Sequence, residues 1–259
     1  MSHDTFDVWD DSRPVTSTAS APVGSRVHQI SVPPIPETDM NWTPYQLFRG
    51  ATPSMHHLTC HASVLAANHS PHEPHEHEDE ELLILLDGEI ELILPDHRSD
   101  LHKHLRPGGL VFYPAHFRHT LRAVGTGTAT YLMFKWVGAA AARNNSLQHC
   151  QFDLGTYLPD SAAHGFQWNE LFEGSTQYLR RLHCHVSSLA PGCGYDPHVD
   201  PYDVAILTLY GDVETLGQAV PPRSVVFYPA GEPHGMRNNG LTVAVYVVFE
   251  FEGDSTPSA

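Results

Sequence analysis

The stretch HEHEDEELLILLDG, residues 75–88, brings together two histidines, a glutamate and a turn signal. Side chains of an extended strand alternate between its two faces. His75, His77 and Glu81 are separated by even numbers of residues, so we expect all three to point to the same side. Asp87 and Gly88 lie between two apolar runs, which is a strong signal of a two-residue β-hairpin. The stretch therefore predicts a hairpin strand that starts at a group of potential metal ligands.

A fourth potential ligand, His119, ends the segment YPAHFRH at residues 113–119. Three imidazoles and one carboxylate suit a first-row divalent metal and leave one or two positions for water or substrate. Segments rich in His and Glu are also common on solvated surfaces, so the alternative is a charged loop that binds nothing. The spacing of the residues that follow favours the metal site.

This spacing resembles the first conserved motif of the cupin family, G-x5-H-x-H-x3-E-x6-G. His75, His77, Glu81 and Gly88 match the motif, and His69 replaces its opening glycine. The departure removes no residue that serves as a ligand in the family.

The second cupin motif, G-x5-P-x-G-x2-H-x3-N, is matched by Gly108, Pro114 and His119. His116 replaces the inner glycine and Ala123 replaces the asparagine. The resemblance implies that the three histidines and the glutamate hold one divalent transition metal per chain. Iron, manganese, nickel, copper and zinc all fit this donor set, and iron or manganese is favoured.

Four segments of the first half of the chain recur in the second half in the same order, which indicates a tandem duplication. The pairs are LFRG 47–50 with LFEG 171–174, LTCHASVLA 58–66 with LHCHVSSLA 182–190, VFYPA 111–115 with 226–230, and YLMFKWVG 131–138 with YVVFEFEG 246–253. Short β-branched runs with frequent Gly and Pro favour an all-β fold. With the resemblance, this predicts two tandem jelly-roll (double-stranded β-helix) cupin barrels, a bicupin. We expect a tail at 1–26, an N-terminal barrel at 27–145 and a C-terminal barrel at 146–259.

The second repeat keeps the framework of the motifs but changes the ligands. His198 and His234 are retained, Asp200 replaces the second histidine, and Val204 replaces the glutamate. His198, Asp200 and His234 could form a second site with two histidines and one carboxylate. The alternative is that the C-terminal barrel has lost its metal and now serves packing.

The composition limits the partners. A formal net charge of −16 argues against binding to nucleic acid or to an anionic membrane. The acidic N-terminus shows no secretory signal, and the four cysteines lack the C-x2-C spacing of metal sites, so we expect a cytoplasmic protein. The expected partner is a small-molecule substrate, with dioxygen as a possible second substrate. We expect the protein to be a monomer or a homodimer.

The resemblance to quercetinase and pirin-like bicupins implies a dioxygenase acting on an enol or phenol, with Glu81 as the base that takes the substrate's proton. The alternatives are a non-redox lyase, isomerase or decarboxylase of a small carboxylate, and a binding protein without turnover. Arg118 and Arg122 flank His119 and could bind a carboxylate, but solvent exposure is equally compatible with their positions. No Lys, Arg or Tyr has a position that assigns it to catalysis, and we expect Glu80 to lie on the surface.

A metal analysis of His77→Ala tests the first site. We expect the unmodified chain, purified without added metal, to carry one transition-metal ion that the variant loses, because His77 supplies one of few ligands. Elemental analysis of both proteins measures this. If the variant keeps its metal, the ion must lie elsewhere, with His198 and His234 as the next candidates.

Overall fold

The computed structural model describes residues 21–37, 40–96, 104–141, 146–157, 159 and 164–254. Strands dominate this part of the chain, and its only helix is the single 3-10 turn η1 (Leu154–Thr156), so the predicted all-β fold is confirmed. Of the predicted tail at residues 1–26, residues 1–20 lie outside the described part of the chain. Within the described part of the chain, no helix is long and apolar enough to cross a membrane.

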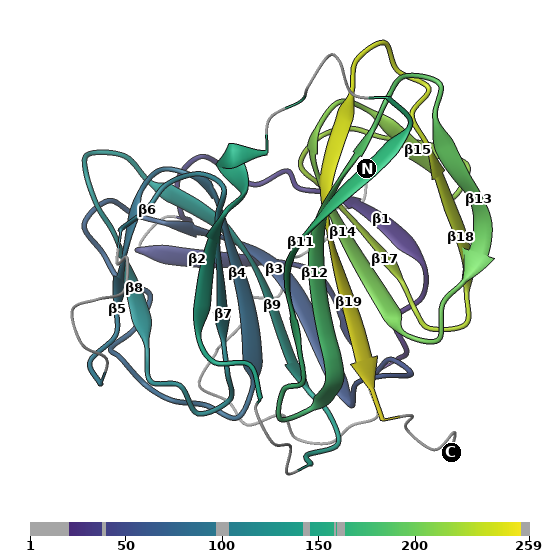
Figure 1. The fold of residues 1–259 in the computed structure, drawn as a ribbon. Helices are drawn as coiled ribbons and strands as arrows, with labels where there is room; N and C mark the ends of the chain where they lie inside the picture. Colours follow the sequence, from purple (N-terminus) through teal and green to yellow (C-terminus); the bar gives the residue numbers. More distant parts are fainter. Residues whose placement is uncertain are drawn as a thin grey trace.

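The first repeat forms a large and a small sheet, on the left of Figure 1. The large sheet has the order β10-β7-β4-β9-β3-β2, and the small sheet has the order β6-β5-β8. Their strands are β2 (Trp42–Gly50), β3 (His57–Leu65), β4 (Glu80–Asp87), β5 (Ile90–Ile93), β6 (His104–Leu105), β7 (Gly109–Tyr113), β8 (Thr120–Ala123), β9 (Ala129–Val137) and β10 (Cys150–Asp153).

The second repeat has the same design, on the right of Figure 1. The large sheet has the order β1-β17-β14-β19-β12-β11, and the small sheet has the order β13-β18-β15-β16. Their strands are β1 (Arg26–Gln29), β11 (Phe166–Gly174), β12 (Leu179–Leu189), β13 (Gly194–Val199), β14 (Asp203–Tyr210), β15 (Val213–Thr215), β16 (Gln218–Val220), β17 (Ser224–Tyr228), β18 (Pro233–Arg237) and β19 (Ala244–Gly253).

The turn at Gly88 does not form the predicted hairpin. β4 pairs with β7 on one edge and β9 on the other, so neither edge is left for β5, which pairs with β6 and β8 in the small sheet. Gly88 has a φ of +79°, and a Cβ there would lie 2.3 Å from the carbonyl oxygen of Thr128. The glycine thus serves a sharp passage from one sheet to the other, which requires the left-handed conformation.

The apolar residues form three clusters that alternate with the sheets. One fills the space between the large and small sheets of the first repeat, and another does so in the second repeat. The largest cluster lies between the two large sheets and takes members from both repeats. Its ring contacts include Phe48 with Phe227, with centroids 5.2 Å apart, and Trp136 with Phe251, at 5.3 Å. Cys60 and Cys184 are buried in the same cluster and unpaired, as expected for packed core thiols.

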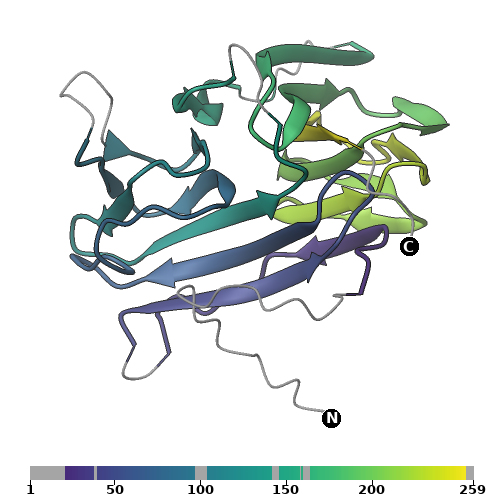
Figure 2. The ribbon, with the colours of Figure 1, turned by 90° about the horizontal axis from the view of Figure 1, so that it is seen from below.

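The two repeats also exchange their edge strands, and Figure 2 shows β1 (purple) beside the yellow-green strands of the second repeat. β1 lies in the range predicted for the N-terminal barrel but pairs with β17 of the second repeat. β10 lies beyond the predicted boundary at residues 145 and 146 but pairs with β7 of the first repeat. Both exchanges cover an edge that would otherwise be open.

The expectation that Glu80 lies on the surface is wrong. Its side chain is fully buried between the barrels, where it accepts hydrogen bonds from Trp136 Nε1 (2.8 Å), Thr176 Oγ1 (2.6 Å) and the backbone NH of Gln177 (2.8 Å). Burial raises the pKa of its carboxyl, and these hydrogen bonds partly offset the rise. Adjacent strand positions face opposite ways, so Glu81 points into the barrel whereas Glu80 points to the other repeat.

The second repeat makes an equivalent contact with the first. Asp203 is fully buried and accepts hydrogen bonds from the Thr52 hydroxyl and from the backbone NH of Ala230 (2.8 Å). The segments LFRGAT and LFEGST place Thr52 and Thr176 at matching positions of the two repeats. Two reciprocal carboxylate–threonine pairs therefore cross the interface between the barrels.

We expect Glu80→Ala to lower the free energy of unfolding by about 2–4 kcal/mol, because it leaves buried donors of Trp136 and Thr176 without an acceptor. Chemical denaturation followed by tryptophan fluorescence measures the loss. Glu78→Ala, two residues earlier and exposed, is the matched control and should change stability by less than about 0.5 kcal/mol. Equal stability of the two variants would show that the interface does not depend on this carboxylate.

Candidate metal centre

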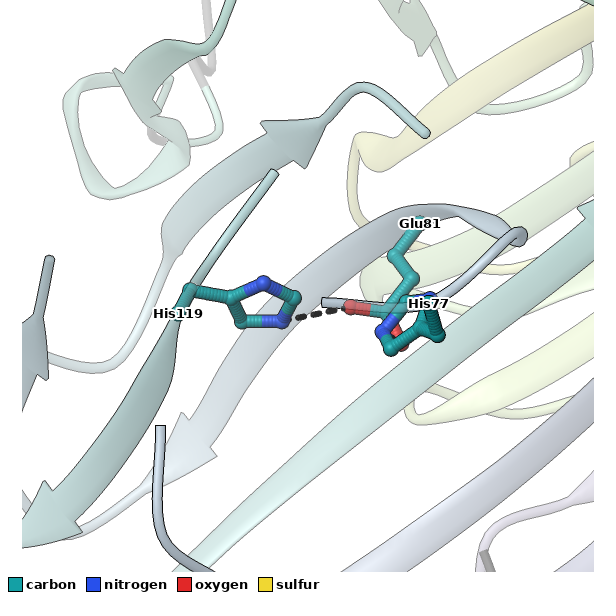
Figure 3. A group of neighbouring side chains, drawn as sticks. All are labelled: His77, Glu81 and His119. Atoms are coloured by element: carbon teal, nitrogen blue, oxygen red, sulfur yellow. Dashed lines mark ion pairs between the residues drawn. The ribbon is translucent and has the colours of Figure 1, made fainter. Parts of the chain in front are cut away.

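Three of the predicted ligands meet inside the first barrel. The ligand atoms of His77, Glu81 and His119 all lie within 4.8 Å of one another (Figure 3). Glu81 Oε1 lies 3.2 Å from His77 Nε2, and Glu81 Oε2 lies 2.8 Å from His119 Nε2. His77 comes from the loop before β4, Glu81 from β4 itself, and His119 from the residue before β8. The large sheet thus supplies the carboxylate, and the loops at its edge supply the imidazoles.

The orientation of the two imidazoles fits a metal. His119 Nδ1 lies 2.7 Å from the carbonyl oxygen of Phe117, and His77 Nδ1 lies 3.1 Å from that of Asp79. A carbonyl only accepts, so each Nδ1 carries the proton and each Nε2 presents a lone pair towards Glu81. Glu81 Oε2 is buried and, despite its proximity to His119, makes no well-formed hydrogen bond within the described structure. Two imidazole Nε2 atoms and a carboxylate that face one another at this distance are a suitable donor set for a divalent ion.

His75, the fourth predicted ligand, is not part of this group. Its backbone pairs with that of His119, with NH-to-carbonyl distances of 3.3 and 3.1 Å, and this pairing joins the two motif loops. The ring of His75 is half-buried. Its centroid lies 4.1 Å from that of the His72 ring and 5.3 Å from that of the His77 ring. The predicted role of His75 as a ligand stays a prediction.

The turn at His116 fixes the second motif loop against the first. His116 has a φ of +62°, so it adopts the left-handed conformation for which the motif uses glycine. Its backbone NH donates to the carbonyl of His77 at 2.8 Å. In the second repeat, Gly231 has a φ of +86° and donates to the carbonyl of Asp200, also at 2.8 Å. The replacement of glycine by His116 therefore keeps the geometry of the loop.

Lys135 is the functional candidate that the sequence analysis missed. It lies opposite Glu81 on β9, its side chain is 8% exposed, and Nζ lies 3.1 Å from Glu81 Oε1. The signal was present in YLMFKWVG, where strand alternation points Tyr131, Met133 and Lys135 the same way. All three line the same small cavity beside the ligands. The first barrel thus contains a buried cation next to the candidate metal centre.

The charges around Glu81 keep it ionised. Burial alone would raise the pKa of its carboxyl, but the Lys135 ammonium and the imidazoles of His119 and His77 outweigh burial and hold the pKa well below its usual range. Burial would lower the pKa of His77, and the Glu81 carboxylate outweighs it and raises that pKa. A strongly ionised carboxylate is a good ligand but a weak acceptor of a substrate proton, so the predicted role of Glu81 as a base stays a prediction.

The space beside this group is small. The cavity measures about 20 Å³ and is lined by the ligands, Lys135 and mostly apolar or aromatic side chains, among them Trp42, Leu83 and Met133. His61 on β3 also lines it, at the position that His185 occupies in the second repeat. A large planar substrate does not fit this space, whereas a substrate of a few heavy atoms needs only modest side-chain movement.

The second predicted site repeats the first in outline. The ligand atoms of His198, Asp200 and His234 lie within 4.8 Å of one another, and Asp200 Oδ2 is 3.5 Å from His198 Nε2 and 3.3 Å from His234 Nε2. Their Nδ1 atoms again face carbonyl oxygens two residues earlier, at 3.2 and 3.1 Å. The His234 ring stacks on Tyr228 (centroids 4.4 Å apart), as His119 stacks on Tyr113 (3.9 Å).

The cavities differ far more than the motif residues do. The second barrel encloses about 560 Å³, lined by this group and by aromatic and charged residues of β11, β12 and β19. The cross-strand pair Glu81–Lys135 of the first barrel is replaced here by Val204–Glu250. The carboxylate has therefore moved one strand away from its position in the first barrel.

Comparison with known proteins identifies the class. The family of the cupin domain matches residues 63–135, which include His75, His77, Glu81, His119 and Lys135. Residues 63–135 thus match a cupin domain, as the two motifs predicted. No curated protein matches its sequence.

Solved structures resemble the whole chain in fold. A protein from Pseudomonas aeruginosa described as glyoxylate-induced shares 13% identity at a TM-score of 0.67, with 99% of each chain covered. The protein Ylba from E. coli shares 12% at 0.63, covering 95% of this chain and 97% of its own. An oxalate decarboxylase variant from Bacillus subtilis shares 12% at 0.61, covering 90% and 79%. At these identities the likeness establishes the cupin fold and not an activity.

Proposed function

We propose that the chain is a metal-dependent enzyme that acts on a small carboxylate substrate in the N-terminal barrel. His77, Glu81 and His119 hold one divalent transition metal, with His75 as the fourth ligand after rotation of its side chain. The observation that carries the proposal is the buried Lys135 ammonium 3.1 Å from Glu81. A buried cation beside the ligands can bind an anionic substrate group and hold it against the metal centre.

Each residue has a distinct task in this proposal. Bound at these ligands, a divalent ion supplies Lewis acidity or, for redox-active metals, dioxygen chemistry. Lys135 exchanges its contact with Glu81 for the substrate carboxylate and stabilises negative charge that develops on it. Trp42, Leu83 and Met133 line the cavity and exclude water from the reacting group. Tyr113 stacks on His119 and fixes the plane of its ring.

The size of the cavity distinguishes the two reaction classes expected from the sequence. The cavity of about 20 Å³ has room for about one water molecule, so a phenol of flavonoid size needs a much larger rearrangement of the lining than a two-carbon acid does. This favours a non-redox decarboxylase or lyase over a dioxygenase with a bulky substrate. One of the structural neighbours is a variant of an oxalate decarboxylase, and it shares the fold at 12% identity.

We expect Lys135→Met to weaken the binding of oxalate or glyoxylate to the manganese-loaded protein roughly 10- to 100-fold, because charged hydrogen bonds are worth about 1.5–3 kcal/mol. Isothermal titration calorimetry measures the affinity. Arg122→Met is the matched control, since it removes one exposed cation that is paired with Glu91 at the surface. Equal affinities for Lys135→Met and the unmodified protein would contradict the assignment of Lys135, provided the metal content is unchanged.

Oxygen dependence separates the non-redox reaction from the dioxygenase expected from the sequence. We expect full turnover of a small carboxylate in anaerobic buffer, because decarboxylation or elimination consumes no oxidant. Product formation followed by NMR, with and without dioxygen, gives the comparison. If turnover stops without dioxygen and resumes when it is added, the oxygenase class is correct and the non-redox proposal fails.

A further inference from the structure

A second group of metal-type donors lies in the C-terminal barrel, away from the two cupin motifs. The ligand atoms of His183, His185 and Glu250 lie within 4.8 Å of one another. His183 and His185 are two residues apart on β12, so both point into the cavity of about 560 Å³ that they line. Glu250 on β19 is the direct cross-strand partner of His183. The group is thus built on two central strands of a rigid sheet and not on loops.

The first repeat does not carry this group at the matching positions. Aligning LTCHASVLA with LHCHVSSLA puts Thr59 at the position of His183, and aligning YLMFKWVG with YVVFEFEG puts Lys135 at the position of Glu250. Of the three donors, only His185 has a matching residue in the first barrel, His61. Barrel packing does not require either change, because the first barrel folds around a threonine and a lysine at these positions.

The surroundings orient the donors. His183 Nδ1 lies 2.9 Å from Glu173 Oε2 on β11, so this carboxylate is placed to hold the proton of Nδ1 and to leave Nε2 as the ligand. Nδ1 of His185 is buried and has no hydrogen-bond partner within the described part of the chain. Arg181 contacts Oε2 of Glu250. Buried Nδ1 atoms of both histidines, His183 and His185, therefore make no well-formed hydrogen bond within the described residues, although Glu173 lies close to the first.

The charge of the cavity favours a cation. Glu170, Glu173, Asp200 and Glu250 line it, and Arg181 is the only lysine or arginine among its lining residues. Arg181 is itself paired with Glu173 at 2.9 Å and with Glu250, so its charge is already balanced. A divalent ion would offset the remaining carboxylates, whereas an anionic ligand would be repelled.

We propose that His183, His185 and Glu250 form a second binding site for a divalent transition metal, separate from the cupin motif positions in both barrels. Two imidazoles and one carboxylate on one face suit zinc, iron or manganese and leave open coordination positions towards the cavity. Trp168, half-exposed at the rim, places its indole edge-on to both imidazoles, with centroids 6.1 and 5.5 Å away. It shields the site on the side of β11.

Zinc binding tests the site in a background that removes the N-terminal centre. The full-length His77→Ala protein, stripped of metal by a chelator, is titrated with Zn²⁺ and the bound ion is counted by elemental analysis. We expect this protein to bind one Zn²⁺ per chain. Adding His183→Gln should weaken its binding at least 10-fold, because one of three protein ligands is lost. Glu250→Gln, which is nearly isosteric, should have the same effect and is the alternative if His183→Gln does not fold.

His198→Gln in the same background is the matched control, because this histidine lines the same cavity but belongs to the cupin motif. We expect its Zn²⁺ affinity to stay within about twofold of the background protein. If His198→Gln loses the ion while His183→Gln and Glu250→Gln keep it, the ion sits at the motif positions and the proposal is overturned. Absence of Zn²⁺ binding by the His77→Ala background also overturns it. The single variant His183→Gln, with His77 intact, should still bind metal at the N-terminal centre. Its N-terminal metal content therefore tests the proposed function separately from the site at His183.

Discussion

The burial of two large sheets against each other is the constraint on which the rest of this structure depends. Each large sheet has one face towards its own small sheet and the other towards the second repeat, so both faces must be apolar. The largest cluster lies between the repeats, and removing apolar surface from water is the main stabilising term in folding. Neither barrel could expose that face in isolation without a large apolar patch. The duplication therefore produces one cooperative unit and not two independent domains joined by a linker.

The same constraint explains why polar residues at the interface come as matched pairs. A buried carboxylate is tolerated only when its oxygens are satisfied. Glu80 accepts a hydrogen bond from Thr176, and Asp203 accepts one from Thr52, so each repeat supplies one acceptor and one donor. The exchange of β1 and β10 follows the same reciprocal pattern at the sheet edges. These contacts fix how the barrels are placed, which leaves the interior of each barrel free to diverge.

The sequence predicted what depends on spacing and repetition. The short β-branched runs predicted the all-β fold, and the repeats predicted the duplication. The motifs predicted that His77, Glu81 and His119 converge, together with His75, because strand alternation and loop conformation are local properties. What it could not predict depends on which strands are neighbours. Asp87-Gly88 has the signal of a hairpin, but the structure uses both edges of β4 elsewhere. Glu80 looked like a solvated charge because its partners are distant in sequence, and two of them, Thr176 and Gln177, lie in the second repeat. Lys135 needed the register of β9 against β4 before it could be placed beside Glu81.

Divergence between the two interiors is largely a matter of where charge is placed on three adjacent strands. In the first barrel the sheet carries Glu81 beside Lys135, and the positive and negative charges neutralise each other in a cavity of about 20 Å³. In the second barrel the matching pair is Val204 beside Glu250, and the carboxylate faces His183 in a cavity of about 560 Å³. Arg181 pairs with Glu250, but the large cavity still has more carboxylates than cations and so favours a cation, whereas the balanced pair in the small cavity can exchange partners with an anion. Because the shared interface holds both sheets in place, these few substitutions change what each cavity can bind without changing the fold.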